Sequence, residues 1–181
     1  LIIDTNANFT TDIDSGTTIT ATWSTFWSYG SRTNAIEVLD GAKVNINRTS
    51  TSGYIFYNGT NKAFVIGDNA EVNINTSKMM NGTAEYISDL IIGENSKFVL
   101  NQVTNSSVLL RTKNISLAKN AIMKATAVNS TTLTANTGGV ITLGENATLD
   151  LARQSGTGVF SRSGTNIMSM DNIGSVRQWT N

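Results

Sequence analysis

Six aromatic and basic residues in the first third of the chain are the strongest candidates for binding chemistry. They lie in the segments TATWSTFWSYGSR and SGYIFYNGTNK, and we select Trp23, Trp27, Tyr29, Arg32, Tyr54 and Tyr57. Aromatic rings stack on the apolar faces of sugars, and a guanidinium group adds directional hydrogen bonds to hydroxyls or carboxylates. We therefore predict a ligand-binding surface here, with Tyr54 and Tyr57 on the same side of the molecule.

The aromatic segment also has a purely structural interpretation. Trp23 and Trp27 are four positions apart, so a short helical turn could bury both and plug the N-terminal end of the domain. Trp179 could cap the opposite end in the same way. Segment 20–34 is therefore either a ligand-binding insertion or an N-terminal cap.

Composition limits the catalytic chemistry that the chain can perform. The 181 residues include no His and no Cys, which excludes a Ser-His-Asp triad, a thiol nucleophile and Cys-ligated zinc. Carboxylates, Lys, Arg and Tyr remain, but no two or three acids cluster around an Arg as a polysaccharide lyase or hydrolase would require. Asp12 and Asp14 form an isolated pair, and Glu85 and Asp89 flank Tyr86. We predict no enzyme activity, no cofactor and no bound metal.

The charge pattern argues against two classes of partner. The formal net charge is zero, so no electrostatic attraction favours nucleic acid or an anionic membrane. No apolar run of about 18 residues is present, so we expect no membrane insertion. Seven scattered basic residues could still align as a stripe that holds an acidic glycan: Arg48, Lys62, Lys78, Arg111, Lys113, Arg153 and Arg162.

A repeat supplies the scaffold for these residues. The pattern apolar, Gly, acid, Asn, small, any, apolar, any, apolar recurs as IGDNAEVNI, IGENSKFVL and LGENATLDL. With looser copies, its small residue falls at successive spacings of 35, 28, 26, 25, 26 and 27 residues, which is typical of a solenoid. Apolar residues alternate after each corner, and two further β-rich patches occupy each period. The sequence predicts one all-β domain over 1–181, a right-handed parallel β-helix of about six coils of about 26 residues with three short strands each.

The corner of the repeat has a structural role in this interpretation. Stacked Asn side chains should bond one another from coil to coil, and the residues concerned are Asn6, Asn69, Asn95, Asn120 and Asn146. Gly67, Gly93 and Gly144 are expected to supply positive φ angles. The acids of the corner should form a solvated column: Asp40, Asp68, Glu94, Glu145 and Asp171.

The corner motifs IGDNAEVNI, IGENSKFVL and LGENATLDL resemble the pectate-lyase-like adhesive domains of Gram-positive surface proteins. The chain is similar, from Ile3 to Val176, to the β-solenoid binding regions of serine-rich-repeat adhesins and of epithelium-binding adhesins of lactobacilli. The resemblance implies a secreted, extracellular adhesin anchored to the cell wall, and this chain would be a fragment of that longer protein. Its partners would be host or matrix polysaccharides or glycoproteins, acidic glycans among them.

Three functions stay open at this point. The first is a non-catalytic adhesin module, which the aromatic segment and the resemblance favour. The second is a polysaccharide lyase or hydrolase, which a cleft of carboxylates with Ca²⁺ would support. The third is a structural stalk or self-association module, because the ends of a solenoid present unpaired strand edges.

Overall fold

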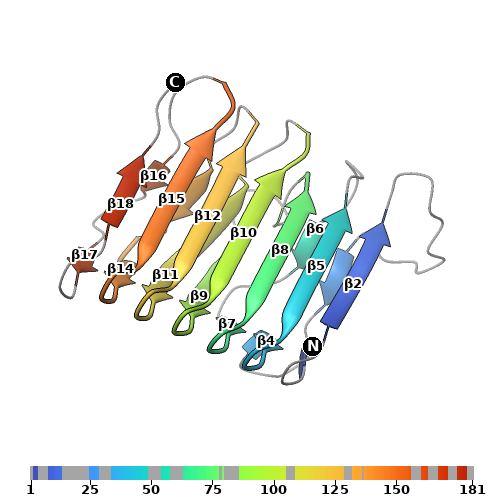
Figure 1. Cartoon of the computed structure of the whole chain (residues 1–181). Coiled ribbons are helices and arrows are strands. Elements are labelled where there is room, and N and C mark those ends of the chain that lie inside the picture. Colours follow the sequence, from blue (N-terminus) through green and yellow to red (C-terminus); the bar gives the residue numbers. More distant parts are fainter. Residues whose placement is uncertain are drawn as a thin grey trace.

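The computed structural model describes residues 2–3, 8–13, 25–28, 34–48, 54–57, 63–77, 79, 86–104, 109–128, 132–135, 137–155, 160–162, 167–170 and 175–178. All regular structure in these residues is β-strand, with no helix among them. Every strand pair is parallel, and each strand bonds to the equivalent strand of the next coil (Figure 1). The described part of the chain is therefore a parallel β-solenoid, as the sequence predicts.

The strands form two large sheets and one small one. The seven-stranded sheet contains, in spatial order, β2 (Asn8–Ile13), β5 (Lys43–Arg48), β8 (Glu71–Thr76), β10 (Lys97–Gln102), β12 (Ile122–Ala127), β15 (Thr148–Arg153) and β18 (Ser175–Gln178). The nine-stranded sheet contains β1 (Ile2–Ile3), β4 (Asn34–Val38), β7 (Ala63–Ile66), β9 (Ile87–Ile92), β11 (Leu110–Leu117), β13 (Leu133–Ala135), β14 (Val140–Leu143), β16 (Phe160–Arg162) and β17 (Ile167–Met170). The two-stranded sheet pairs β3 (Thr25–Ser28) with β6 (Tyr54–Tyr57).

The period-two pattern of the sequence decides which face of each strand is buried. In β8 the buried residues are Val72, Ile74 and Thr76, and those between them are half-buried. In the next strand, Leu100 is paired with Ile74 on one side and with Ala125 on the other. Equivalent apolar residues thus stack on the inner face of the sheet, and equivalent polar residues stack on its outer face.

The number of regular coils is smaller than the sequence suggested. Asn69, Asn95, Asn120 and Asn146 adopt the same corner conformation, and they delimit about three turns of about 26 residues. The expectation of about six coils is not supported. The strands outside these turns follow offsets that include 35 residues, between Asn8 and Lys43.

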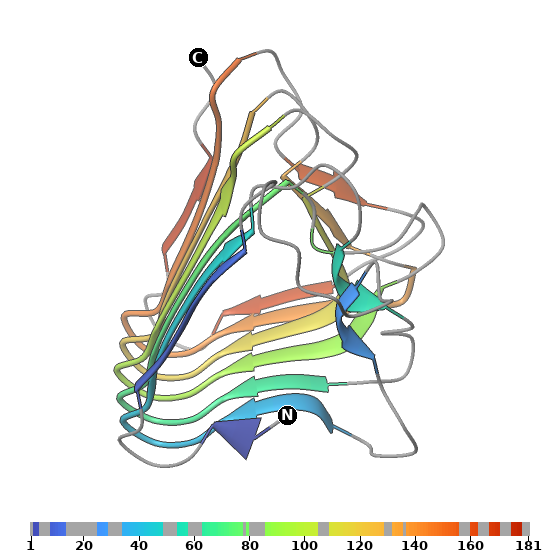
Figure 2. The same cartoon turned by 90° about the vertical axis from the view of Figure 1, so that its right-hand side faces the viewer.

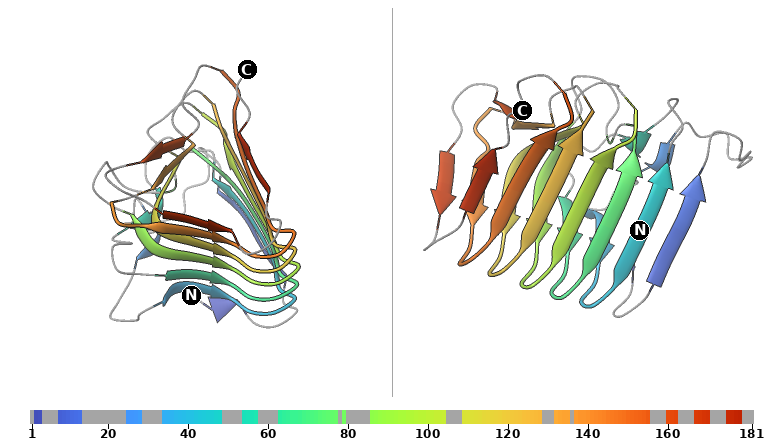
Figure 3. Two further views of the ribbon diagram at one scale, coloured as in Figure 1. Left: turned by 90° about the vertical axis from the view of Figure 1, so that its left-hand side faces the viewer. Right: turned by 45° about the horizontal axis from the view of Figure 1, so that its top comes forward.

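The hydrophobic core lies between the two large sheets, which meet at an angle along the stack of corner turns (Figures 2 and 3). Phe64 of β7 and Phe98 of β10 are both fully buried, and their rings meet edge to face with centroids 5.6 Å apart. The contact joins the two sheets across the interior. It therefore helps to fix the angle between the sheets as well as burying apolar area.

The conformation of the corner differs from the sequence prediction in one respect. The positive φ angles fall on the four Asn residues, with φ between 55° and 57°, and not on Gly67, Gly93 or Gly144. Asn tolerates this region better than other residues that carry a side chain. In the coil that is one residue shorter at its corner, Gly41 takes the positive φ instead.

The corner glycines Gly67, Gly93 and Gly144 lie where neighbouring coils pack closely. A Cβ atom on Gly93 would lie 2.5 Å from Asp68 Oδ1 and 2.6 Å from the carbonyl carbon of Gly67. A Cβ atom on Gly144 would lie 2.9 Å from the backbone of Ala118. These glycines therefore leave room for the neighbouring coil, and the prediction of positive φ at these positions was wrong.

Candidate binding surfaces

The aromatic site that the sequence predicts falls partly on the two-stranded sheet. Trp27 lies in β3, and Tyr54 and Tyr57 lie in β6. In the register of these strands Trp27 is paired with Phe56, and Tyr57 with Ser28. Aromatic positions from two successive coils are therefore brought to adjacent strands. Trp23, Tyr29 and Arg32 lie outside the described residues, as does Trp179.

The cap interpretation assumed a helical turn that includes Trp27. Residues Thr25–Ser28 form a strand, so that turn is not present at Trp27. Strand residues alternate between the two faces of a sheet, and Tyr54 and Tyr57 are three positions apart in β6. They take alternate positions of one strand, and the expectation that their side chains share a side of the molecule stays a prediction.

The register divides the two-stranded sheet into two faces. Trp27, Tyr54 and Phe56 occupy positions of one face, and Tyr57 occupies the same face as Ile55. Ile55 is fully buried in the core. The positions of Trp27 and Tyr54 therefore alternate with that of Ile55 along the paired strands.

The seven basic residues of the predicted stripe do not share one face of the solenoid. Arg48 and Arg153 lie in the seven-stranded sheet, whereas Arg111, Lys113 and Arg162 lie in the nine-stranded sheet. Lys62 and Lys78 lie outside the described residues. The five described residues are divided between two sheets and do not make a continuous stripe.

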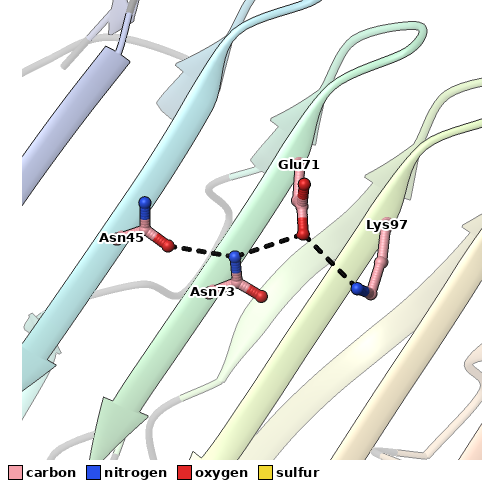
Figure 4. Close-up of polar contacts among 4 residues, drawn as sticks. All are labelled: Asn45, Glu71, Asn73 and Lys97. Atoms are coloured by element: carbon pink, nitrogen blue, oxygen red, sulfur yellow. Dashed lines mark hydrogen bonds and ion pairs between the residues drawn. The ribbon is translucent and has the colours of Figure 1, made fainter.

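Five Asn residues form a second polar surface, on the outer face of the seven-stranded sheet. We call it the amide face, and it consists of Asn45, Asn47, Asn73, Asn75 and Asn101. In one row, Asn73 Nδ2 donates to Asn45 Oδ1 at 3.0 Å (Figure 4). In the other, Asn75 Nδ2 donates to Asn47 Oδ1 at 2.6 Å and Asn101 Nδ2 donates to Asn75 Oδ1 at 3.1 Å. These rows hold the amides in fixed orientations along the solenoid.

A charged row borders the amide face. Glu71 Oε1 lies 3.3 Å from Lys97 Nζ and 3.4 Å from Asn73 Nδ2 (Figure 4), and Lys43 is its register partner on the other side. The hydrogen bond from Asn73 and the attraction of the two lysines lower the pKa of Glu71, although partial burial opposes them. Glu71 is therefore held as a carboxylate between two cations.

A similar row follows on the next strands. Lys124 Nζ lies 3.9 Å from Asp150 Oδ2, and Asp150 is paired in the register with Arg177. Asp150 Oδ1 is inaccessible and has no hydrogen-bond partner among the described side chains. Charges of opposite sign thus alternate from strand to strand in this row too, which avoids like charges on neighbouring strands of the seven-stranded sheet.

The acids of the sequence prediction whose side chains are described are used in structure or exposed to solvent. Asp40, Asp68, Glu94 and Glu145 are exposed at the corner, while Asp171 and Glu85 lie outside the described residues. Asp89 accepts hydrogen bonds from Asn114 Nδ2 and Ser88 Oγ, both at 2.7 Å. Among the described residues no three potential metal ligands of the His, Cys, Asp or Glu type come together.

The corner column contains one cation, Lys119, which lies 2.9 Å from Glu145. The hydrogen bond to Glu145 and its charge raise the pKa of Lys119. The Asn ladder predicted at the corner is confirmed for Asn95, Asn120 and Asn146, whose side chains bond from coil to coil. These corner residues thus have structural partners.

Sequence reasoning missed the amide face, although a signal for it was present. Asn occurs at alternate positions in the strands KVNINR and EVNINT and again in KFVLNQ. Alternation with Val and Ile places these Asn residues on the outer face, and the repeat places them in adjacent coils. Because Asn is abundant throughout the chain, its alternation with Val and Ile in these strands does not stand out from the composition.

No protein-family model matches this chain, and neither a curated protein nor a solved structure is found to match it. The fold defines the class of protein: an all-β parallel solenoid, consistent with a β-helix of the pectate-lyase type. Within the described residues no helix is long and apolar enough to cross a membrane.

Proposed function

We propose that this protein is a non-catalytic adhesin module that binds host or matrix glycans or glycoproteins, displayed on the cell wall of a Gram-positive bacterium. Its scaffold would be a right-handed β-helix. The observation that supports the proposal is the pairing of β3 with β6, which aligns Trp27 with Phe56 and Thr25 with Tyr54 in the register of the two strands. Aromatic positions on neighbouring strands suit stacking on sugar rings.

The absence of a cluster suited to catalysis among the described residues supports binding over cleavage. A β-helix hydrolase or lyase needs two or three acids, or acids with Ca²⁺, around one bond of the substrate. Asp89 instead accepts structural hydrogen bonds, Glu71 pairs with Lys97, and the corner acids are exposed. A polysaccharide-cleaving enzyme is therefore the weaker alternative.

A structural stalk is the second candidate function, and the ladders favour it. Side-chain hydrogen bonds run from coil to coil both on the amide face and at the corner. A rod that only separates two domains would need such longitudinal bonding and no ligand. The two functions differ in whether the aromatic positions matter for binding.

The test is a glycan and mucin binding screen at pH 4.5 and pH 7. The wild-type chain is compared with a Trp27→Ala, Tyr54→Ala variant, which removes two aromatic groups from one face. A Tyr86→Ala variant serves as a matched control, because Tyr86 is a half-buried aromatic residue outside β3 and β6. Circular dichroism establishes that each variant is still rich in β structure.

We expect the wild type and the control to bind and the double variant to lose binding. Binding by all three proteins would show that the aromatic face is not the adhesive site. If no glycan or mucin is bound and no polysaccharide is cleaved, the adhesin proposal fails and the stalk is favoured.

A further inference from the structure

The rows of the amide face share one polarity. Each Asn Nδ2 donates toward the preceding coil, from Asn73 to Asn45, from Asn75 to Asn47 and from Asn101 to Asn75. Each row therefore presents a carbonyl oxygen at its C-terminal end. Both rows stop in the middle of the sheet and not at its edge, so these terminal oxygens lie on a continuous strand surface.

The terminal oxygen of the first row belongs to Asn73. The residue paired with Asn73 on the next strand is Val99, which has no side-chain donor. Figure 4 shows the Asn73 oxygen directed away from Asn45, while its nitrogen bonds to Asn45 and Glu71. Asn73 Oδ1 accepts no hydrogen bond within the described part of the chain.

The second row ends in the same way one strand further along. Asn101 is paired with Thr126, and no hydrogen bond joins the two side chains in the described structure. Asn101 lies two positions beyond Val99 on β10, so both occupy the outer face, and Val99 is half-buried. Two open acceptors thus flank a small apolar surface.

The charges next to this group are already paired. Glu71 lies between Lys97 and Lys43, and Lys124 is close to Asp150. An anionic ligand would have to compete with these carboxylates for the lysines. The complementary ligand is instead uncharged, with hydroxyl donors for the two oxygens and C–H surface for Val99.

We propose that Asn73, Val99 and Asn101 form a subsite for a neutral, extended polysaccharide that lies across β8 and β10. This inference rests on the proposed glycan-binding function and names its ligand class. Neighbouring strands are about 4.8 Å apart, comparable to the length of one sugar residue in an extended chain. Successive sugars along the solenoid can therefore meet successive strands.

The experiment measures affinity of the full chain for soluble linear mannan and for mixed-linkage glucan, with hyaluronan as the acidic comparison. The test variant Asn73→Val, Asn101→Val removes both open oxygens and two bonds between amides. The matched control Asn45→Val, Asn47→Val also removes two bonds between amides, but it keeps both oxygens. Thermal unfolding of each variant monitors folding.

We expect the wild type and the control to bind at least one neutral polysaccharide and the test variant to bind about tenfold more weakly, the loss expected from two hydrogen bonds. Added salt should have little effect on this binding. Equal binding by the test variant, or equal losses in both variants, would overturn the proposal.

The outcome also separates this inference from the proposed function. Binding of hyaluronan alone through the aromatic face would overturn the neutral subsite and leave the adhesin proposal standing. Binding of neutral glycan that depends on Asn73 and Asn101 but not on Trp27 would support the subsite and reject the aromatic site. Absence of binding to all three polysaccharides would overturn the neutral subsite, and the adhesin proposal would fail as well only if the glycan and mucin screen were also negative.

Discussion

The carboxylate of Asp68 accepts a hydrogen bond at 2.7 Å from the backbone N–H of Glu94, one coil further along the solenoid. Its Oδ1 atom occupies the space in which a side chain on Gly93 would begin. Asp40 makes the same contact one coil earlier, accepting from the backbone N–H of Asp68 at 2.8 Å. An acid and a glycine of neighbouring coils therefore act together to set the spacing of the corners.

The first prediction concerns this contact between coils. Gly93→Ala should lower the free energy of unfolding by about 1–3 kcal/mol, because the new methyl group overlaps Asp68 and the backbone of Gly67. Ala118 occupies the equivalent corner position of the next coil, so Ala118→Gly is the control. It should cost no more than about 1 kcal/mol. Urea unfolding measures both, and equal losses would contradict the packing argument.

The second prediction concerns the positive φ of the corner Asn residues. Asn95→Ala should destabilise the fold by about 1–2 kcal/mol, because Ala is strained at φ 55° and cannot accept the 2.9 Å hydrogen bond from Asn120. Asn95→Gly should cost less, since Gly tolerates this angle. Asn101→Ala removes an amide that bonds to a neighbouring coil from the middle of a strand. It therefore measures the loss of the hydrogen bond separately from the strain of a positive φ angle. A larger loss for Gly than for Ala would reject the backbone explanation.

The third prediction concerns the edge-to-face contact in the core. Phe98→Ala should destabilise the protein by about 3–5 kcal/mol, because the ring is fully buried. A double-mutant cycle of Phe64→Leu and Phe98→Leu should give a coupling energy of about 0.5–1.5 kcal/mol for the ring pair. Additive effects of the two substitutions would mean that the rings contribute only buried area.

The fourth prediction is the pH dependence of Glu71. Its pKa lies below the ordinary value of 4.5, first because Asn73 donates a hydrogen bond to the carboxylate. Since the folded pKa is lowered, the stabilisation is present above the ordinary value and is lost as the pH falls through the lowered value. Asn73→Val should move the pKa of Glu71 up toward 4.5, whereas Asn45→Val should not, and NMR of the carboxyl carbon measures both. Equal shifts would contradict this cause.

The fifth prediction concerns ligand binding at mildly acidic pH. The chain contains no His, so no side chain has an ordinary pKa near 6.5. Binding of an uncharged glycan should therefore be constant between about pH 5.5 and 7.5, and any change at lower pH should come from carboxylates. A titration with a midpoint near 6.5 would contradict the prediction, and calorimetry across the range measures it.

The sequence alone determined the type of fold. A repeat of about 26 residues with period-two alternation can bury its apolar residues only by stacking equivalent strands, and the register of β8, β10 and β12 follows that spacing. The absence of His and Cys also limits the available chemistry, however the chain is arranged in space. These conclusions depend on local pattern and composition, which tertiary contacts do not change.

Only the tertiary structure decided the roles of the corner residues and where the rows of the amide face end. The need for glycine at Gly93 comes from Asp68 in another coil, a contact that no local rule includes. The terminal oxygen of Asn73 accepts no hydrogen bond from the next strand, because the residue paired with Asn73 there is Val99, whose side chain has no donor. Such properties depend on which residues lie side by side after the coils stack, so they follow from register and not from the sequence of one coil.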